Sequence, residues 1–235
     1  RSSDLPDLVA PNVLVDAMIQ AFLRAFVVGL RLWAVEDPKS RAFAGVGAFN
    51  LVRRTAFDRT PGFEWLRLEV ADDMGLGLMM KRHGGRSALA NASGLMCVEW
   101  YPTFGDAARG VEKAFASVGH CSVVRMLLIS VLAPLVELAP VVVPVAAWLP
   151  PPYGIPGLQP AAVVLLAAAA GSIAVVSRWS RRRVIPGLLL PVVAVVSAYL
   201  LLRTTWVGWR RGGIVWRDTL YPSTLLRGKL RVRIP

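Results

Sequence analysis

Three long apolar segments constrain the fold of this chain most strongly. They cover residues 126–149, 157–177 and 184–202, and the second and third contain no charged residue. A helix needs about 20 apolar residues to cross the hydrocarbon core of a bilayer. The sequence therefore predicts a helical membrane region over residues 122–202, and we expect a multi-pass protein of the cell (inner) membrane.

The first apolar segment is less regular than the other two. Three prolines, at positions 134, 140 and 144, interrupt its backbone hydrogen bonding, and Glu137 lies in its interior. Two structures fit this pattern. The segment is either a kinked span or a helical hairpin that enters the bilayer and returns on the same side.

Arginines follow the second and third apolar segments. One basic segment is "RWSRRR", residues 178–183, and the other is a basic amphipathic tail over residues 203–235. Cationic flanks favour the cytoplasmic side of a membrane, yet three simple crossings would put these two segments on opposite sides. A re-entrant first or third segment would change that outcome, so the sequence leaves the side of the tail open.

The formal net charge is +12, which raises the question of what the protein binds. The cations flank apolar spans, and the aromatic-interleaved basic surface of a nucleic-acid module is missing. Attraction to anionic lipid head groups explains the charge with fewer assumptions. We therefore predict anionic lipids as partners and no nucleic acid.

Residues 1–121 carry nearly all the acidic residues and form the predicted polar domain. Its first part, residues 8–34, has apolar residues at helical spacing, interrupted by Asp16, Arg24 and Arg31. This pattern fits an interfacial helix, which we favour because membrane spans follow, or a core helix of a soluble domain. The two cysteines and two histidines lack the spacing of a metal site.

A Gly-x-Gly pair, Gly45 and Gly47, precedes the stretch "AFNLV" in the polar domain. Glycine permits a tight turn or a close backbone approach. We expect "AFNLV" to form a short buried strand that ends at Arg53 and Arg54. The pattern is not a dinucleotide fingerprint, because the third glycine and the following helix are missing.

The stretch "RLEVADD" holds three carboxylates close together, those of Glu69, Asp72 and Asp73. One of the aspartates could cap a helix by accepting hydrogen bonds from free backbone amides. At helical spacing all three would instead share a face, which raises the pKa of at least one carboxyl group and suits a general base. The residues alone leave capping and catalysis equally open.

The order of these motifs resembles the C-terminal portion of membrane-bound family-2 glycosyltransferases, in the subgroup of ceramide glucosyltransferase-like and hopanoid or carotenoid glycosyltransferase-like enzymes. The resemblance rests on "GVGAFNLVRR", on "EVADD" opening a helix that ends in "KRHGGR", on "VEWYPTFGDAARGVEKAFASV", on three apolar spans and on "GGIVWRDTLYP". It covers most of residues 40–235. The implied fold is an α/β fragment, the acceptor-side half of a GT-A-type domain, followed by the membrane helices.

The resemblance also implies an activity, namely inverting transfer of a sugar from a nucleotide-sugar donor to a lipid acceptor at the cytoplasmic face. Carried over by position, Asp73 is the general base and Asp72 its catalytic neighbour. The other candidate residues, which we expect to bind substrate, are Gly45, Gly47, Arg53, Arg54, Glu69, Trp100, Tyr101 and Trp216.

The aromatic candidates also have structural interpretations. Trp100 and Tyr101 could stack against a sugar, line a lipid entry or anchor the protein at the membrane surface. Trp216 could anchor the tail among lipid head groups, or it could fold the tail against the polar domain as a lid together with Tyr221.

Two motifs of the family are missing from this sequence, which limits the activity that the resemblance implies for it. The family's Asp-x-Asp metal motif is missing from this sequence, so its divalent metal (Mg or Mn) would be held by a donor half outside these residues, and we predict no metal ligand among them. The Gln-x-x-Arg-Trp motif of processive members is also missing, which favours a single transfer over polymer synthesis. The alternative is a non-catalytic membrane subunit or a degenerate remnant of such an enzyme.

Overall fold

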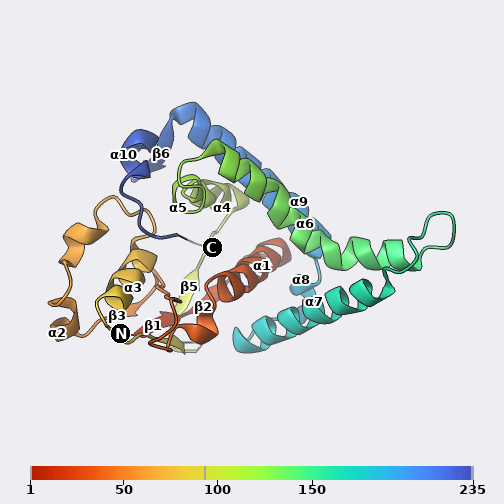
Figure 1. Cartoon of the computed structure of the whole chain (residues 1–235), viewed down its shortest axis with the longest axis horizontal. Coiled ribbons are helices and arrows are strands. Elements are labelled where there is room, and N and C mark those ends of the chain that lie inside the picture. The colour runs from red at the N-terminus through yellow and green to blue at the C-terminus, as the bar shows by residue number, and fades with distance from the viewer. Residues whose placement is uncertain (1, 93, 234–235) are drawn as a thin grey trace.

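The computed structural model describes residues 2–92 and 94–233. Figure 1 shows the small strands and short helices gathered at one end of the molecule, with long helices extending away from them. The predicted order, an α/β part followed by a helical membrane region, agrees with this arrangement. The strands are few and short, and they do not by themselves identify a GT-A-type domain.

Two small sheets organise the polar domain. In the first, β1 (Ser2–Leu5) lies between β3 (Asn50–Leu51), which is antiparallel to it, and β4 (Ala88–Asn91), which is parallel. In the second, β2 (Asp7–Val9) pairs in parallel with β5 (Cys97–Glu99). The prediction of a buried strand over "AFNLV" is wrong in two respects, because only two residues pair and Leu51 is 61% exposed at the sheet edge.

Helices cover the sheets and connect them to the membrane region. They are α1 (Val13–Gly29), η1 (Leu32–Ala34), α2 (Arg54–Phe57), η2 (Gly62–Leu66), α3 (Asp72–Arg82), α4 (Phe104–Val111) and α5 (Ala114–Ser117). Met74 and Leu78 of α3 pack into the largest apolar cluster with residues that follow α1, including Leu32 and Val35. This packing fixes α3, and with it the acidic pair at its start.

Among the residues that the structure describes, three helices are long and apolar enough to cross a membrane, as predicted. They are α6 (Val123–Trp148), α7 (Gln159–Trp179) and α9 (Leu190–Arg211). The prolines of α6 bend it, as Figure 1 shows, but the helix is continuous, so the helical-hairpin interpretation of this segment is wrong. Val136 of α6 and Val195 of α9 are about 70% exposed, at 72% and 68% respectively, which suits contact with lipid chains.

The third apolar segment is divided. A short helix, α8 (Val184–Gly187), precedes α9, and the chain bends at Leu188 and Leu189 before Pro191. α9 continues to Arg211, past the predicted end at residue 202, and Gly212 ends it in the left-handed conformation with a φ of 66°. The rest of the tail forms the hairpin β6 (Gly213–Trp216) and β7 (Thr219–Pro222), followed by α10 (Ser223–Arg227).

The first helix, α1, buries polar as well as apolar side chains, and its position at the membrane interface stays a prediction. Its buried face includes the polar side chains of Gln20 and Arg24. Arg24 donates to Glu137 of α6 with an N to O distance of 2.5 Å, which explains how a carboxylate is tolerated in an apolar helix. α1 thus links the polar domain to the membrane helices.

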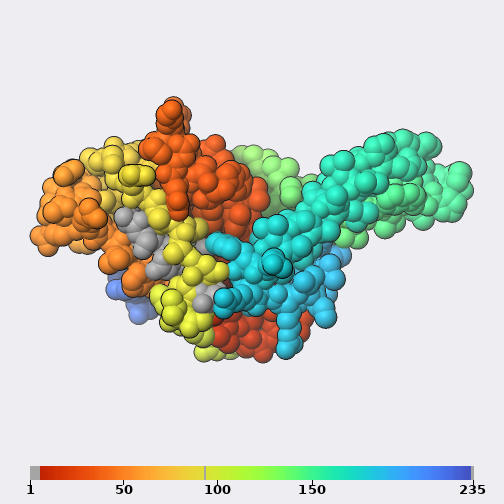
Figure 2. Space-filling view, turned by 90° about the horizontal axis from the view of Figure 1, so that it is seen from below, coloured from red at the N-terminus to blue at the C-terminus, as the bar shows by residue number. Residues whose placement is uncertain are grey.

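Both basic segments contact the polar domain. The carbonyl of Trp179, at the end of α7, accepts a hydrogen bond from the Asn91 side chain at 2.6 Å. At the end of α9, Arg203 and Arg211 each lie 2.8 Å from a carboxylate oxygen of Glu112. Figure 2 shows the α6–α7 hairpin projecting away as an arm, so its tip, residues 149–158, lies apart from both basic segments.

Candidate functional site

The acidic pair lies in the first turn of α3. The helix begins at Asp72, and the preceding cap residue is Ala71, which supplies no side-chain hydrogen bond. The Asp72 carboxylate accepts from the amide of Asp73 at 3.1 Å, and the Asp73 carboxylate accepts from the amide of Met74 at 2.7 Å. The helix therefore begins at the acidic pair, as predicted, and both carboxylates satisfy free amides of the first turn.

The Gly-x-Gly segment packs directly against Asp73. A Cβ atom added to Gly47 would lie 3.2 Å from Oδ2 of Asp73, closer than an ordinary van der Waals contact. The Gly47 amide also forms a hydrogen bond with the Asp73 carboxylate. The sequence predicted a close backbone approach or a tight turn here, and the structure shows a close approach of the backbone to a carboxylate.

The surroundings of Asp73 raise the pKa of its carboxyl group above the ordinary value of 3.8. Burial is the main cause, because it disfavours the charged form, and the negative charge of Asp72 acts in the same direction. Hydrogen bonds from the amides of Met74 and Gly47 lower the pKa and offset part of that rise. A half-buried carboxylate with a raised pKa is a chemically competent proton acceptor.

Glu69 does not share a helical face with the two aspartates, because α3 begins three residues after it. Its side chain is buried, with 2% exposed. The Oε2 atom accepts hydrogen bonds from the backbone amides of Arg231 and Val232, at 2.6 Å and 3.0 Å. The prediction of one cluster of three carboxylates is therefore wrong, and Glu69 binds the end of the tail instead.

The end of the tail continues this contact across the polar domain. The Arg231 guanidinium lies over the ring of Trp65, 4.7 Å from its centroid, and donates a hydrogen bond to the Trp65 carbonyl. Val232 is 1% exposed and belongs to the same apolar cluster as Met74 of α3. This docking site was not predicted, because its signal in the sequence is a single valine between two arginines.

The remaining candidates of the Gly-x-Gly region are spread out. Gly45 is buried. Arg53 precedes α2 and is exposed, and Arg54 forms a surface ion pair with Asp58 at 2.8 Å. Neither arginine forms an ion pair with Asp72 or Asp73 among the residues that the structure describes. Their assignment to substrate binding remains a prediction.

The Trp100 and Tyr101 rings pack onto helices. The ring of Trp100 stacks on that of Tyr101 at 5.3 Å and contacts Phe22 of α1 at 4.7 Å, measured between centroids. The Tyr101 hydroxyl packs against Gly110 of α4, and burial raises its pKa. The pair thus connects α1 with α4, and its binding of a sugar or a lipid stays a prediction.

Trp216 and Tyr221 face each other across the β6–β7 hairpin, with ring centroids 6.1 Å apart. The ammonium group of Lys113, just before α5, lies 5.3 Å from the centre of the Trp216 ring. The hairpin therefore packs beside α5. The tail is docked behind α3 by other contacts, those between Glu69 and the amides of Arg231 and Val232.

No group of three or more histidine, cysteine, aspartate or glutamate side chains in the described residues could hold a metal ion. With Glu69 turned toward the tail, the acidic pair offers two side chains only. The divalent metal that the family resemblance implies, held by a donor half outside these residues, remains a prediction.

Comparison with known protein families, with curated proteins and with solved structures finds no match for this chain.

Proposed function

We propose that this chain is the acceptor-side part of an inverting membrane glycosyltransferase, in which Asp73 is the general base. The observation that supports this proposal best is the placement of Asp73. Its carboxylate is half-buried at the start of a helix, its pKa is raised by burial and by Asp72, and the backbone of Gly47 lies against it. A base of this kind takes the proton from an acceptor hydroxyl as that oxygen attacks the anomeric carbon, whose bond to the donor phosphate breaks so that the nucleoside diphosphate leaves.

The two aspartates have different roles in this proposal. Asp72 remains exposed and holds its charge beside Asp73, which keeps the Asp73 carboxyl group more basic. Gly47 has no side chain and so leaves room for the Asp73 carboxylate, and its backbone amide holds that carboxylate in its orientation. The nucleotide-sugar donor and its metal bind to a donor half outside these residues, and the acceptor is a membrane lipid.

The membrane arrangement in this proposal follows from the contacts of the basic segments. Residues 178–183 and the end of α9 both contact the polar domain, so we place all three on the cytoplasmic side, where basic segments are favoured. α9 begins and ends on that side, so in this arrangement α6 and α7 cross the membrane and α9 lies along its surface. The tip of the α6–α7 hairpin then reaches toward the opposite side. A lipid acceptor can approach the polar domain along the exposed apolar faces of the helices.

The test is Asp73→Asn in the full-length protein that carries this chain. Loss of the base should lower the transfer rate by about 10²-fold to 10⁴-fold, while membrane insertion and thermal stability stay unchanged because asparagine can still accept the Met74 amide. Asp37→Asn is the matched control, since Asp37 is exposed. Normal transfer by Asp73→Asn would refute the assignment of Asp73 as the base, whereas no transfer by the unmodified protein would favour a non-catalytic membrane subunit.

A further inference from the structure

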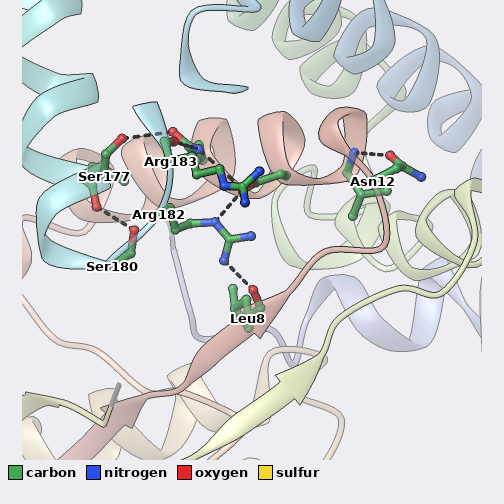
Figure 3. A network of polar contacts seen from close by, with 10 residues as sticks. Leu8, Asn12, Ser177, Ser180, Arg182 and Arg183 are labelled. Carbon is green, nitrogen blue, oxygen red and sulfur yellow. Dashed lines mark hydrogen bonds and ion pairs between the residues drawn. The ribbon is translucent and has the colours of Figure 1, made fainter. Parts of the chain in front are cut away.

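An open groove runs between the start of α1 and the loop that follows α7. It has a volume of about 520 Å³. Residues of β2, of the first turn of α1 and of the loop 180–183 line it. Figure 3 shows this loop facing α1, with the Arg182 side chain reaching toward Leu8.

One arginine of the groove is fully engaged with protein groups. Arg182 lies 2.6 Å from the Asp16 carboxylate of α1, and its guanidinium also donates to the carbonyl of Leu8. The Arg183 carbonyl accepts from the Gln20 side chain at 2.8 Å, which holds the loop backbone in place. The loop is therefore rigidly attached to α1, and its geometry is preformed.

The other two arginines keep their charge available. Arg181 and Arg183 are exposed, line the groove, and form no ion pair within the part of the chain that the structure describes. Arg181 also has a φ of 52°, the left-handed conformation in which glycine is favoured over arginine. The N-terminal end of α1 opens into the same groove and adds partial positive charge, since only the amide of Val15 is capped by Asn12.

Two aspartates line the groove together with the three arginines, so the groove keeps a net charge of +1. Asp16 is paired with Arg182, and the Asp7 carboxylate accepts from the amide of Gly94 at 2.7 Å. The groove thus combines two available guanidinium groups with a helix N-terminus, an arrangement that binds phosphate oxygens.

Apolar surface adjoins the groove on its membrane side. Ile185 of α8, which precedes the lining residue Pro186, is 70% exposed. Val175, near the end of α7 that leads into the loop, is 64% exposed. A ligand that binds there has an anionic phosphate next to hydrocarbon. We propose that this groove binds the phosphate of an anionic phospholipid head group, with Arg181 and Arg183 as its ligands and the acyl chains against α7 and α8. This site does not depend on the proposed transfer activity.

Fluorescent phosphatidylglycerol provides the test, titrated against the purified full chain in neutral detergent and followed by anisotropy. Phosphatidylcholine with the same fluorophore is the reference lipid. The chain should bind phosphatidylglycerol more tightly. The double variant Arg181→Gln/Arg183→Gln should lose about 25-fold in affinity, about fivefold for each arginine, and Arg183→Lys should keep most of the affinity because the charge remains.

The matched control is Arg41→Gln/Arg59→Gln, which removes two exposed arginines elsewhere and should bind like the unmodified chain. An equal loss in this control would show that net charge alone attracts the lipid and would overturn the site. Equal affinity of the unmodified chain for the two lipids would overturn it as well. Displacement by inorganic phosphate at the concentration at which unlabelled phosphatidylglycerol displaces the probe would identify a free-phosphate site instead.

Discussion

Glu69 and Asp73 lie four residues apart, and the protein gives them opposite surroundings. Glu69 is buried and faces backbone amides of the tail, whereas Asp73 is half-buried at the start of α3 and faces the Gly-x-Gly backbone. Burial raises the pKa of both carboxyl groups. A raised pKa alone therefore does not distinguish a base from a structural acid, and what the carboxylate contacts decides its role.

The contacts of Glu69 also join distant parts of the sequence. The tail crosses behind α3 after the last membrane helix, and Val232 enters the apolar cluster that supports α3. The position of Asp73 consequently depends on residues at the other end of the chain. Changes at the Glu69 contacts should therefore affect stability, and changes at Asp73 should affect transfer.

The largest of these further effects should come from deleting the docked tail. Truncation after Leu230 removes the two backbone amides that donate hydrogen bonds to Glu69. It also removes the buried Val232 side chain. The loss of these two amide partners by a buried carboxylate should lower the free energy of unfolding by about 3 kcal/mol. Thermal unfolding in detergent measures this loss. Truncation after Val232 keeps these contacts and should unfold like the full chain, whereas an equal loss would place the stabilising contacts elsewhere.

Gly47→Ala should act on Asp73 without destabilising the fold. The added methyl group would lie 3.2 Å from Oδ2 of Asp73 and should displace the carboxylate by a few tenths of an ångström. We expect about a tenfold lower transfer rate in the full-length protein. Gly29→Ala is the control, because a Cβ there meets nothing within 4 Å. If the two alanine variants turn over equally fast, the Gly47 contact does not orient the base.

Asp72→Asn should shift the pH dependence of transfer more than its maximal rate. Transfer requires deprotonated Asp73, so the rate should rise with pH through the pKa of Asp73, above its ordinary value of 3.8. The charge of Asp72 raises that pKa, so its removal should move the rising limb to lower pH. Rate profiles of the two proteins provide the measurement, and a shift to higher pH would contradict the electrostatic role of Asp72.

The smallest effect concerns the pH dependence of stability at Glu69. Its pKa is raised above the ordinary value of 4.5 in the folded protein. The protonated form thus contributes stability below that ordinary value, and the contribution is lost as the pH rises through the folded pKa. As the pH rises through the folded pKa, the unfolding temperature of the unmodified chain should fall relative to that of Glu69→Gln, which cannot ionise. Parallel curves would show that Glu69 ionises alike in both states.

The sequence predicted the features that depend on local pattern. The three apolar helices follow from apolar stretches long enough to cross a bilayer, and the start of α3 follows from two aspartates that satisfy first-turn amides. The bend in α6 follows from its internal prolines. Each of these features is determined by residues that are close together in the chain.

Long-range contacts could not be predicted in the same way. The pairing of Arg24 with Glu137, of Arg182 with Asp16 and of Glu69 with the tail amides joins residues more than a hundred positions apart. Helical spacing suggested that Glu69 belongs with Asp72 and Asp73, but the chain before α3 is not helical at that point. The role of a single apolar residue such as Val232 cannot be read from the sequence, because distant residues form the cluster into which it packs.

The most direct test of the separate roles compares transfer by Asp73→Asn and Glu69→Gln in the full-length protein at equal amounts of folded enzyme. Glutamine keeps an oxygen for the tail amides, so Glu69→Gln should retain transfer within about threefold, while Asp73→Asn should lose at least about 100-fold. Equal losses in the two variants, or full activity in Asp73→Asn, would contradict the assignment of Asp73 as the base and of Glu69 as the anchor of the tail.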